Sequence, residues 1–337
     1  MIPAFGISVV IPLYNGARYI GDTLDSLSAQ SEPVAEVLVI DDGSSDDGAQ
    51  MAEAHAIAPK VIRQANRGVA YCRNLGALLA SRSHVAFLDQ DDLWAPERHA
   101  RLLRFLRSSP EVEVVVTTCA GFSLVSDNEA LRATGERLHL GSPVVSSVVE
   151  ALNGCHRPDA GDVPLISRRL TLRELLAGPP SVTASLVVSR QRFVSAGGCA
   201  PFARSFDDYI ALLDMTIGGD VVLLDEPSLL YRIHPASTTM STDWSRPLLA
   251  GITAVRHGGN IVPAGNARNP DVVPRLLDDR QFFASHIRSL ACQGMTGFLD
   301  ALAFTRLLGT TRRERARAYA LCTKAWLRSI VPRSSSN

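Results

Sequence analysis

Residues 7–46 have the sequence ISVVIPLYNGARYIGDTLDSLSAQSEPVAEVLVIDDGSSD, and this stretch decides the fold. It contains two short runs rich in β-branched residues, Ile7–Leu13 and Glu36–Ile40, which have the composition of buried strands. Between them, Ala17–Ala29 shows the apolar spacing of an amphipathic helix. Two such strands joined through a helix predict a βαβ unit, in which the strands are parallel and the crossover is right-handed.

The same alternation of strand and helix patterns continues along the chain. The next predicted elements are helix 48–58, strand 61–62, helix 69–81, strand 85–88, helix 95–108 and strand 112–118. We therefore expect an α/β fold with a Rossmann-like, mostly parallel sheet flanked by helices. The strands are almost entirely apolar, which is typical of a sheet covered on both faces.

The second half of the sequence is less regular. Segment 126–180 is rich in Gly, Pro, Ser and Arg, and it predicts a loop-rich insertion with one helix near Leu170–Leu176. Regular structure resumes in four predicted elements: strand 184–189, helix 190–196, helix 208–218 and strand 221–224. We expect two domains, residues 1–243 with the sheet and a helical C-terminal extension over residues 244–337.

Composition excludes several classes of protein. The 34 Lys and Arg side chains balance 34 Asp and Glu side chains, so the chain lacks the positive field of a dedicated nucleic-acid binder. The six cysteines have no Cys-x-x-Cys spacing, which argues against a zinc site or a disulfide framework. No apolar run approaches the roughly 18 residues of a membrane span, and the first residues lack the basic start of a signal peptide. We expect a cytoplasmic protein.

Acidic and turn-forming residues follow three of the predicted strands. They are the segments Pro12–Gly16, Asp41–Asp46 and Asp89–Asp92, and each alone is typical of an ordinary polar turn. The carboxyl ends of parallel strands share one edge of a sheet, where ligands bind. Carboxylates gathered there repel one another unless a cation offsets their charge, and oxygen ligands favour Mg²⁺ or Mn²⁺ bridging to a phosphorylated ligand over zinc. Alternatively, Asp42 accepts a hydrogen bond from an imide or amine of a nucleotide base.

Four motifs resemble those of family 2 glycosyltransferases, which have the GT-A fold. They are Pro-x-Tyr-Asn at 12–15, Asp-Asp-Gly-Ser at 41–44, Asn-Arg-Gly with Ala-x-x-Arg-Asn-x-Gly at 66–76, and Leu-Asp-Gln-Asp-Asp-x-Trp-x-Pro at 88–96. Weaker similarity extends the match to residues 5–240. The resemblance implies a metal-dependent, inverting transfer of a sugar from a nucleotide-diphosphate sugar, in most relatives a UDP-sugar, to an acceptor hydroxyl. It also implies a carbohydrate or lipid-linked acceptor and a role in cell-surface polysaccharide or glycoconjugate assembly.

The resemblance further implies roles for individual residues. The donor-binding residues that it implies are Pro12, Tyr14, Asn15, Asp42, Arg73, Asp89 and Gln90. Among them, Asp42 resembles the residue that recognises the base, and Tyr14 resembles the residue against which the base and ribose pack. Asp91 resembles the direct ligand of Mn²⁺ or Mg²⁺ in the family's Asp-x-Asp element. Asp89 and His234 are the further metal ligands that the resemblance suggests.

Asp208 resembles the second acid of a Glu-Asp pair that supplies the general base in this family. Asp207 stands where Glu is usual, and the choice between Asp207 and Asp208 as the base stays open. Both acids also suit the first turn of a helix, where carboxylates cap the N-terminus. His234 likewise has two interpretations, since a neutral imidazole can coordinate Mn²⁺ but a lone histidine is often structural.

The last part of the chain carries one further pattern. Residues 312–331 place basic side chains on one helical face and apolar ones on the other. Such a helix either packs on the catalytic domain or makes peripheral contact with an anionic membrane, here the inner face of the plasma membrane.

Two other functions stay open at this stage. One is a catalytically silent scaffold that binds a nucleotide sugar without a working base. The other is a sugar-phosphate nucleotidyltransferase, which would need a Gly-rich, basic phosphate loop after the first strand, and Pro12–Gly16 does not supply one. An NAD-dependent oxidoreductase is disfavoured because no G-x-G-x-x-G motif follows that strand.

Overall fold

The computed structural model describes the larger of two compact units of the chain. This unit is formed by Met1–Pro201 and Asp207–Thr242. The described residues are 3–133, 142–155, 165–171, 174–175, 180–199, 207–215 and 219–237. The predicted helical extension over 244–337, with its amphipathic helix at 312–331, lies outside them. No helix within the described ranges is both long and apolar enough to cross a membrane.

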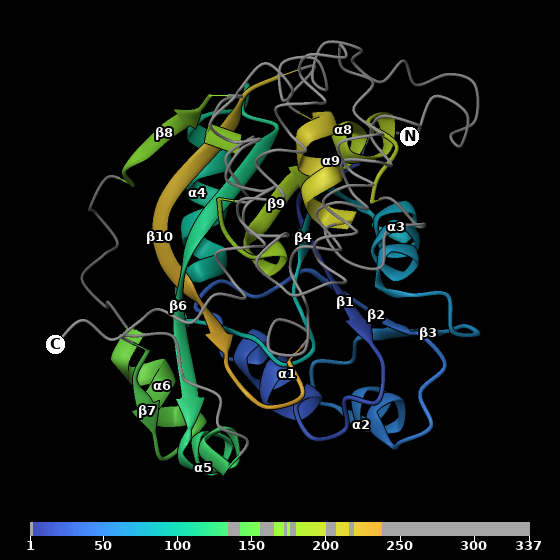
Figure 1. Ribbon diagram of the computed structural model, residues 1–337. Helices are drawn as coiled ribbons and strands as arrows, with labels where there is room; N and C mark the ends of the chain where they lie inside the picture. The colour runs from blue at the N-terminus through green and yellow to red at the C-terminus, as the bar shows by residue number, and fades with distance from the viewer. Residues whose placement is uncertain are drawn as a thin grey trace, which may run out of the picture. The chain divides into compact units, whose positions relative to one another are not determined.

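The first half of the unit is the parallel sheet that the sequence predicts. Strands β1 (Ala4–Leu13), β2 (Glu36–Asp41), β3 (Lys60–Arg63) and β4 (Arg82–Phe87) lie side by side in the order β3-β2-β1-β4, and each adjacent pair is parallel (Figure 1). The connecting helices are α1 (Ile20–Ser28), α2 (Gly48–Ala54) and α3 (Val69–Leu79). The predicted βαβ repeats are therefore confirmed.

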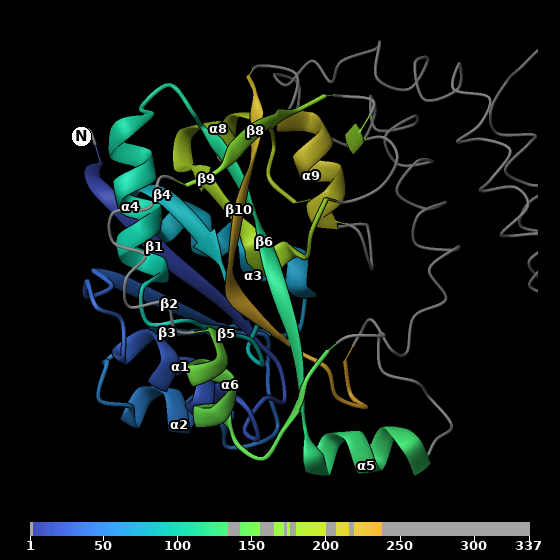
Figure 2. The same cartoon turned by 90° about the vertical axis from the view of Figure 1, so that its left-hand side faces the viewer.

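The alternation of side chains along β1 explains how the helices cover both faces of the sheet. Ile7, Val9, Ile11 and Leu13 are fully buried in one apolar core with side chains of α1, α2 and α4 (Arg98–Ser108). Val10 points the other way and packs against Gly76 of α3. Successive residues of a strand face opposite sides, so an almost wholly apolar strand fits between two helical layers (Figure 2).

Beyond β4 the sheet becomes mixed. Strand β9 (Leu186–Ser189) lies antiparallel between β4 and β6 (Val114–Leu124), and β10 (Val221–Arg232) then runs parallel to β6. The short strands β5 (Leu93–Trp94) and β8 (Ser167–Leu170) pair antiparallel with β10, and β7 (Val144–Val145) pairs with β6. The helices near the end of this half are α8 (Arg190–Ser195) and α9 (Asp207–Met215).

The structure differs from the prediction in the segment after β6. Where the sequence predicts loops and one helix near Leu170–Leu176, the chain also forms helices α5 (Val125–Ala133) and α6 (Val148–Cys155). Leu170 ends strand β8, and Glu174 and Leu175 are helical within the predicted range. Helix α5 buries the polar side chains Asp127 and Asn128. A hydrophobic pattern therefore underestimates how much of this helix is buried.

Strand β10 is much longer than the predicted run Val221–Leu224. The sequence Asp225-Glu226-Pro227 looks like a strand end, because proline cannot donate a hydrogen bond to a neighbouring strand. The structure accommodates it through a register shift between Leu224 and Leu229, after which β10 pairs with β6 again. The strand thereby continues to Arg232 and carries His234 to the edge where β4 ends.

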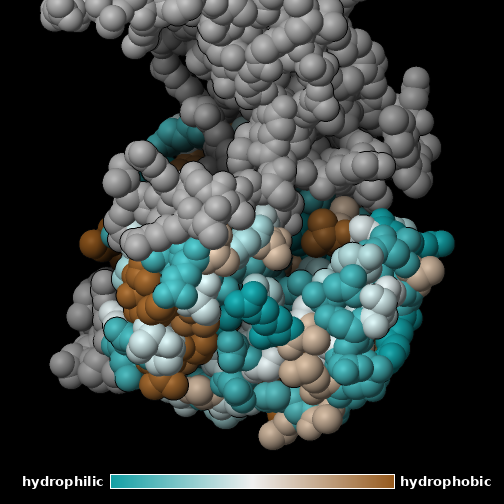
Figure 3. All heavy atoms as spheres, turned by 60° about the horizontal axis from the view of Figure 1, so that its bottom comes forward, coloured by the Kyte–Doolittle hydropathy of each residue, from teal (hydrophilic) through white to brown (hydrophobic). Residues whose placement is uncertain are grey.

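Apolar side chains also reach the surface near α5 and α6. Figure 3 views the end of the unit where α1, α2, α5 and α6 lie, and apolar side chains, in brown, gather on part of it. The exposed large apolar residues in α5, β7 and α6 are Val125, Val144 and Val149. The elements after β6 therefore add an apolar surface that is separate from the buried core.

The contact between Gly76 and Val10 yields a test of the packing of α3 on β1. A Cβ atom at position 76 would lie 2.2 Å from Cγ1 of Val10. Gly76→Ala should therefore lower the free energy of unfolding by about 1–3 kcal/mol, the usual cost of overpacking. Urea unfolding followed by circular dichroism measures this.

The matched control for this test is Gly154→Ala in α6, where a Cβ atom would meet nothing within 4 Å. That change should be neutral or slightly stabilising, because alanine favours a helix over glycine by roughly 0.5–1 kcal/mol. Equal unfolding midpoints for Gly76→Ala and the wild type would contradict the close packing of α3 on β1.

Candidate functional site

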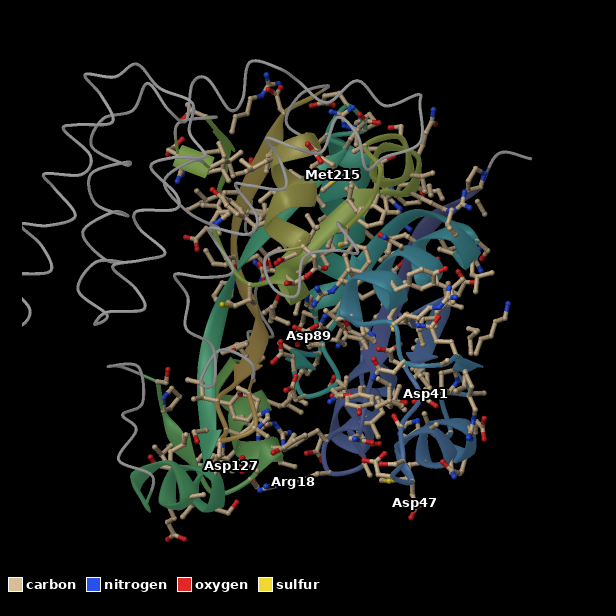
Figure 4. The ribbon with its side chains drawn as sticks, turned by 45° about the vertical axis from the view of Figure 1, so that its right-hand side comes forward. Arg18, Asp41, Asp47, Asp89, Asp127 and Met215 are labelled. Carbon is tan, nitrogen blue, oxygen red and sulfur yellow. The ribbon has the colours of Figure 1, made fainter. Side chains whose placement is uncertain are left out.

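The residues that follow β1, β2 and β4 meet at one edge of the sheet. Figure 4 shows Asp89, after β4, and Asp41, at the end of β2, on this edge. Gln90 joins the segments after β1 and β4, since its Oε1 accepts from the backbone N–H of Tyr14 at 2.8 Å and its Nε2 donates to the Tyr14 carbonyl at 3.2 Å. The polar segments that follow β1, β2 and β4 therefore lie together at one edge of the sheet, as predicted.

The loop after β1 is fixed to the loop after β2 by Asn15. Its Oδ1 accepts from the backbone N–H of Ser45 at 2.8 Å, and its own N–H donates to Oγ of Ser44 at 3.0 Å. Asn15 has a φ of 48°, a conformation that asparagine tolerates better than most residues. Pro12 is buried within β1, whereas the Tyr14 side chain is 50% exposed and free to meet a ligand.

Asp42 organises the loop that precedes α3. Its Oδ1 accepts from Nε2 of Gln64 and from the N–H of Arg67, both at 2.8 Å, and its Oδ2 accepts from the N–H of Gly68 at 2.7 Å. The side chain is almost fully buried. Sequence reasoning missed this anchoring role, because its partners stand more than twenty residues away from Asp42. The predicted role in reading a base stays a prediction.

Arg73 lies between two acids from distant parts of the chain. Its Nη2 donates to Oδ1 of Asp89 at 3.0 Å, and its Nη1 donates to Oδ2 of Asp207 at 3.0 Å. Arg73 and Asp207 are buried. Burial raises the pKa of both Asp89 and Asp207, and the Arg73 guanidinium opposes this rise. Arg73 thus connects the acidic end of β4 to the first turn of α9.

Asp91 and His234 form a second close pair. Nε2 of His234 lies 2.8 Å from Oδ2 of Asp91, although the two residues are 143 positions apart. His234 is almost fully buried, and the Asp91 side chain is 22% exposed. The structure therefore brings together two of the three metal ligands that the resemblance suggests. The third, Asp89, has its Oδ1 engaged by Arg73.

Asp92 is a buried carboxylate behind this pair. Its Oδ1 accepts from the backbone N–H of Arg232 at 3.0 Å, while its Oδ2 has no hydrogen-bond partner within the described residues. Burial raises the pKa of Asp92 well above its ordinary value, and the charges of Asp91 and Asp89 raise it further. A permanent negative charge at this position would be costly.

Asp208 stands in the first turn of α9 and is half-buried. Oγ1 of Thr183 donates a hydrogen bond to its Oδ2, and the negative charge of Asp208 raises the pKa values of Asp89 and Asp207. The predicted base and the acids after β4 therefore belong to one electrostatic cluster. Thr183, in a short 3-10 turn before β9, had no sequence signal that pointed to this contact.

The comparison with known families agrees with this arrangement. Residues 8–140 match the family model described as glycosyl transferase family 2. The chain contains a family 2 glycosyltransferase domain. The predicted resemblance is confirmed, and the matched segment runs from within β1 to beyond β6 and includes the acids after β2 and β4.

Relatives extend the similarity of the glycosyltransferase domain beyond the matched segment. An uncharacterized glycosyltransferase of Nostoc sp. is 29% identical over 242 residues, which cover 70% of this chain and 67% of that protein. An uncharacterized glycosyltransferase of Haemophilus influenzae is 23% identical over 240 residues, or 70% of this chain and 71% of that protein. These matches support transferase function at the level of the family.

Solved structures show the fold of the glycosyltransferase domain. The crystal structure of S. aureus TarS 1–349 in complex with UDP has a TM-score of 0.57 at 15% identity, with 99% of this chain and 94% of that chain covered. The same fragment in complex with UDP-GlcNAc has a TM-score of 0.59 at 15% identity, with 98% and 93% covered. The GT-A fold expected from the motifs is confirmed.

The buried carboxylate of Asp92 predicts a specific pH dependence of stability. Because its folded-state pKa lies above the ordinary value of 3.8, the folded chain binds this proton more tightly than the unfolded chain. Its contribution to stability is therefore fully present below that ordinary value and is lost as the pH rises through the folded-state pKa. Asn cannot titrate, so Asp92→Asn should gain stability relative to the wild type across this window, by up to about 1.4 kcal/mol per pH unit.

Urea unfolding at a series of pH values measures this difference for Asp92→Asn. The matched control is Asp47→Asn at the exposed Asp47 before α2 (Figure 4), which should follow the wild-type curve. A difference between Asp92→Asn and the wild type that does not change with pH would show that burial does not raise the pKa of Asp92.

Proposed function

We propose that this glycosyltransferase domain moves a sugar from a UDP-sugar to an acceptor hydroxyl with inversion at the anomeric carbon. The observation that carries the proposal is the Arg73 bridge, which brings the acids after β4 and the Asp207-Asp208 pair of α9 into one cluster. An inverting displacement needs a leaving-group site and a base at one reaction centre. The UDP and UDP-GlcNAc complexes of TarS support a nucleotide-sugar donor for this fold.

The nucleotide end of the donor would lie along the loops after β1 and β2. The exposed ring of Tyr14 offers a surface for the base and ribose, and the hydrogen bonds of Asn15 and Gln90 hold that surface in place. Asp42 follows the adjacent strand, and its carboxylate, which already accepts three hydrogen bonds, would accept a further one from the base. Arg73 supports the sugar side of this site by fixing Asp89.

The donor set beside Asp91 fits a divalent cation that phosphate oxygens complete. The described residues contain no cluster of three or more His, Cys, Asp or Glu side chains that could enclose a metal by themselves. One carboxylate and one imidazole, from Asp91 and His234, suit Mn²⁺ or Mg²⁺, since such ions commonly take few protein ligands and add substrate phosphates. Asp89 adds negative charge next to this pair. When bound, the cation stabilises the charge that develops on the departing diphosphate.

Asp208 is the base in this proposal, rather than Asp207. Asp207 is buried and both of its oxygens accept from Arg73, whereas Asp208 is half-buried and one of its oxygens is held by Thr183. The second oxygen of Asp208 would then accept the proton of the acceptor hydroxyl as that hydroxyl attacks the anomeric carbon. Asp207 positions the helix that carries the base.

The acceptor and the cellular role are proposed from the family resemblance. The acceptor is a carbohydrate or a lipid-linked sugar, and the reaction belongs to the assembly of cell-surface polysaccharides or glycoconjugates. A cytoplasmic enzyme in peripheral contact with the membrane through residues 312–331 would meet a lipid-linked acceptor at the membrane that holds it.

The assignment of the base predicts the effect of Asp208→Asn. This variant should lower kcat for sugar transfer by about 10²- to 10⁴-fold, the usual contribution of general base catalysis, while it still binds UDP. Release of UDP from a donor and calorimetric titration with UDP measure the two quantities. The exposed Asp220 provides the control, and Asp220→Asn should keep wild-type turnover. Full turnover in Asp208→Asn would exclude Asp208 as the base.

A thermal-shift panel of nucleotide sugars tests the donor and the metal together. A ligand that binds only the folded chain raises the melting temperature, so UDP-sugars with Mn²⁺ should stabilise the wild type more than UDP-sugars alone. Asp91→Ala should lose the part of the shift that depends on Mn²⁺. Binding of UDP without turnover of any donor would instead favour the silent scaffold.

A further inference from the structure

Tyr19 occupies a buried position next to His234. The residue immediately precedes α1, is 6% exposed, and its ring centroid lies 4.4 Å from that of His234. The guanidinium carbons of Arg18 and Arg232 lie 5.2 Å and 5.1 Å from the centre of the Tyr19 ring. The position of this ring is therefore determined by its packing.

A line of polar contacts runs from Tyr19 to the edge of the sheet. The Tyr19 hydroxyl lies 3.1 Å from Nδ1 of His234, and Nε2 of the same imidazole lies 2.8 Å from Oδ2 of Asp91. Tyr19, His234 and Asp91 come from three separate segments of the chain. No motif in the sequence pointed to Tyr19, because its partner stands 215 positions away.

We propose that Tyr19 is a positioning residue, whose hydroxyl orients His234 so that Nε2 faces the cation site beside Asp91. This inference rests on the cation site of the proposed function and adds a residue that makes no contact with the cation. It gives the Tyr19 hydroxyl a role in cation affinity rather than in packing alone.

The chemistry of the hydroxyl suits this role. When Nδ1 accepts from the Tyr19 O–H, the proton of the neutral imidazole is on Nε2, which donates to Asp91. When the proton is on Nδ1, it donates to the Tyr19 oxygen, and the lone pair of Nε2 is available to a cation. A hydroxyl both donates and accepts, so His234 keeps its Nδ1 hydrogen bond in either tautomer with no net gain or loss of protons.

The surroundings of Tyr19 hold the hydroxyl in place. Arg18 donates to Asp127 at 2.6 Å (Figure 4), and Arg232 donates to Asp22 at 2.7 Å. Both guanidinium groups that flank the ring are therefore themselves anchored. The backbone N–H of Tyr19 donates to the Gly16 carbonyl at 2.9 Å. Residues that orient a metal-binding histidine typically contribute 10- to 100-fold to metal affinity.

The test is the affinity of the full chain for Mn²⁺ in the presence of UDP, measured from the electron paramagnetic resonance signal of free Mn²⁺. Tyr19→Phe keeps the ring and removes the hydroxyl, and it should weaken Mn²⁺ binding by about 10- to 100-fold. The control is Tyr71→Phe, which removes a hydroxyl that accepts a hydrogen bond from Nη1 of Arg67, and this variant should bind Mn²⁺ like the wild type.

A double-mutant cycle separates a role through His234 from a general loss of structure. His234→Gln alone should weaken Mn²⁺ binding, and adding Tyr19→Phe to it should cause little further loss, because the hydroxyl then has no imidazole to orient. An undiminished effect of Tyr19→Phe in the His234→Gln background would overturn the proposal. Wild-type Mn²⁺ affinity in Tyr19→Phe would overturn it too, and the cation site would stand. If the wild type bound no Mn²⁺, both the cation site and the role of Tyr19 would fall, although transfer by Asp208 would not.

Discussion

The ion pairs of Arg73 with Asp89 and Asp207 are the interaction on which the site depends. Arg73 and Asp207 are buried and Asp89 is partly buried, and removal of one partner from a buried pair typically costs 3–5 kcal/mol because the other charge is left without compensation. Without the guanidinium, Asp89 and Asp207 would repel each other. The bridge thus determines how far α9, and with it Asp208, lies from the acids at the end of β4.

Helix α3 places Arg73 where it can form this bridge. Gly76 allows the helix to lie directly against Val10 of β1, and Asn74 exchanges hydrogen bonds of 2.8 Å with the backbone of Cys199 in the segment after α8. Gly198, with a φ of 67°, lets that segment pass close to Asn74. The Arg-Asn-x-Gly motif is therefore explained by three separate contacts: one to the acids, one to the approach to α9, and one to the sheet.

The sequence allowed prediction of the features that depend on local patterns. Apolar runs and their spacing indicated the parallel strands β1 to β4, and the polar residues after them indicated the edge at which the candidate site lies. Features that depend on distant partners were not predictable. The proximity of His234 to Asp91 was expected from the family resemblance and from no pattern within either segment. The hydrogen bond from Thr183 to Asp208 leaves no signal at all, because Thr183 is an ordinary residue in its own segment. Helix α5 was missed because the side chains it buries include acids and amides.

The two hydrogen bonds between Gln90 and the backbone of Tyr14 have a consequence for the thermodynamics of ligand recognition. They hold the main chain on both sides of an exposed aromatic ring, so a ligand that stacks on this ring has to restrict only the torsions of one side chain. The entropy that an unrestrained loop would lose on association was already lost when the chain folded. Little of the favourable enthalpy of stacking is then offset by a loss of loop entropy, so most of it contributes to the free energy of binding.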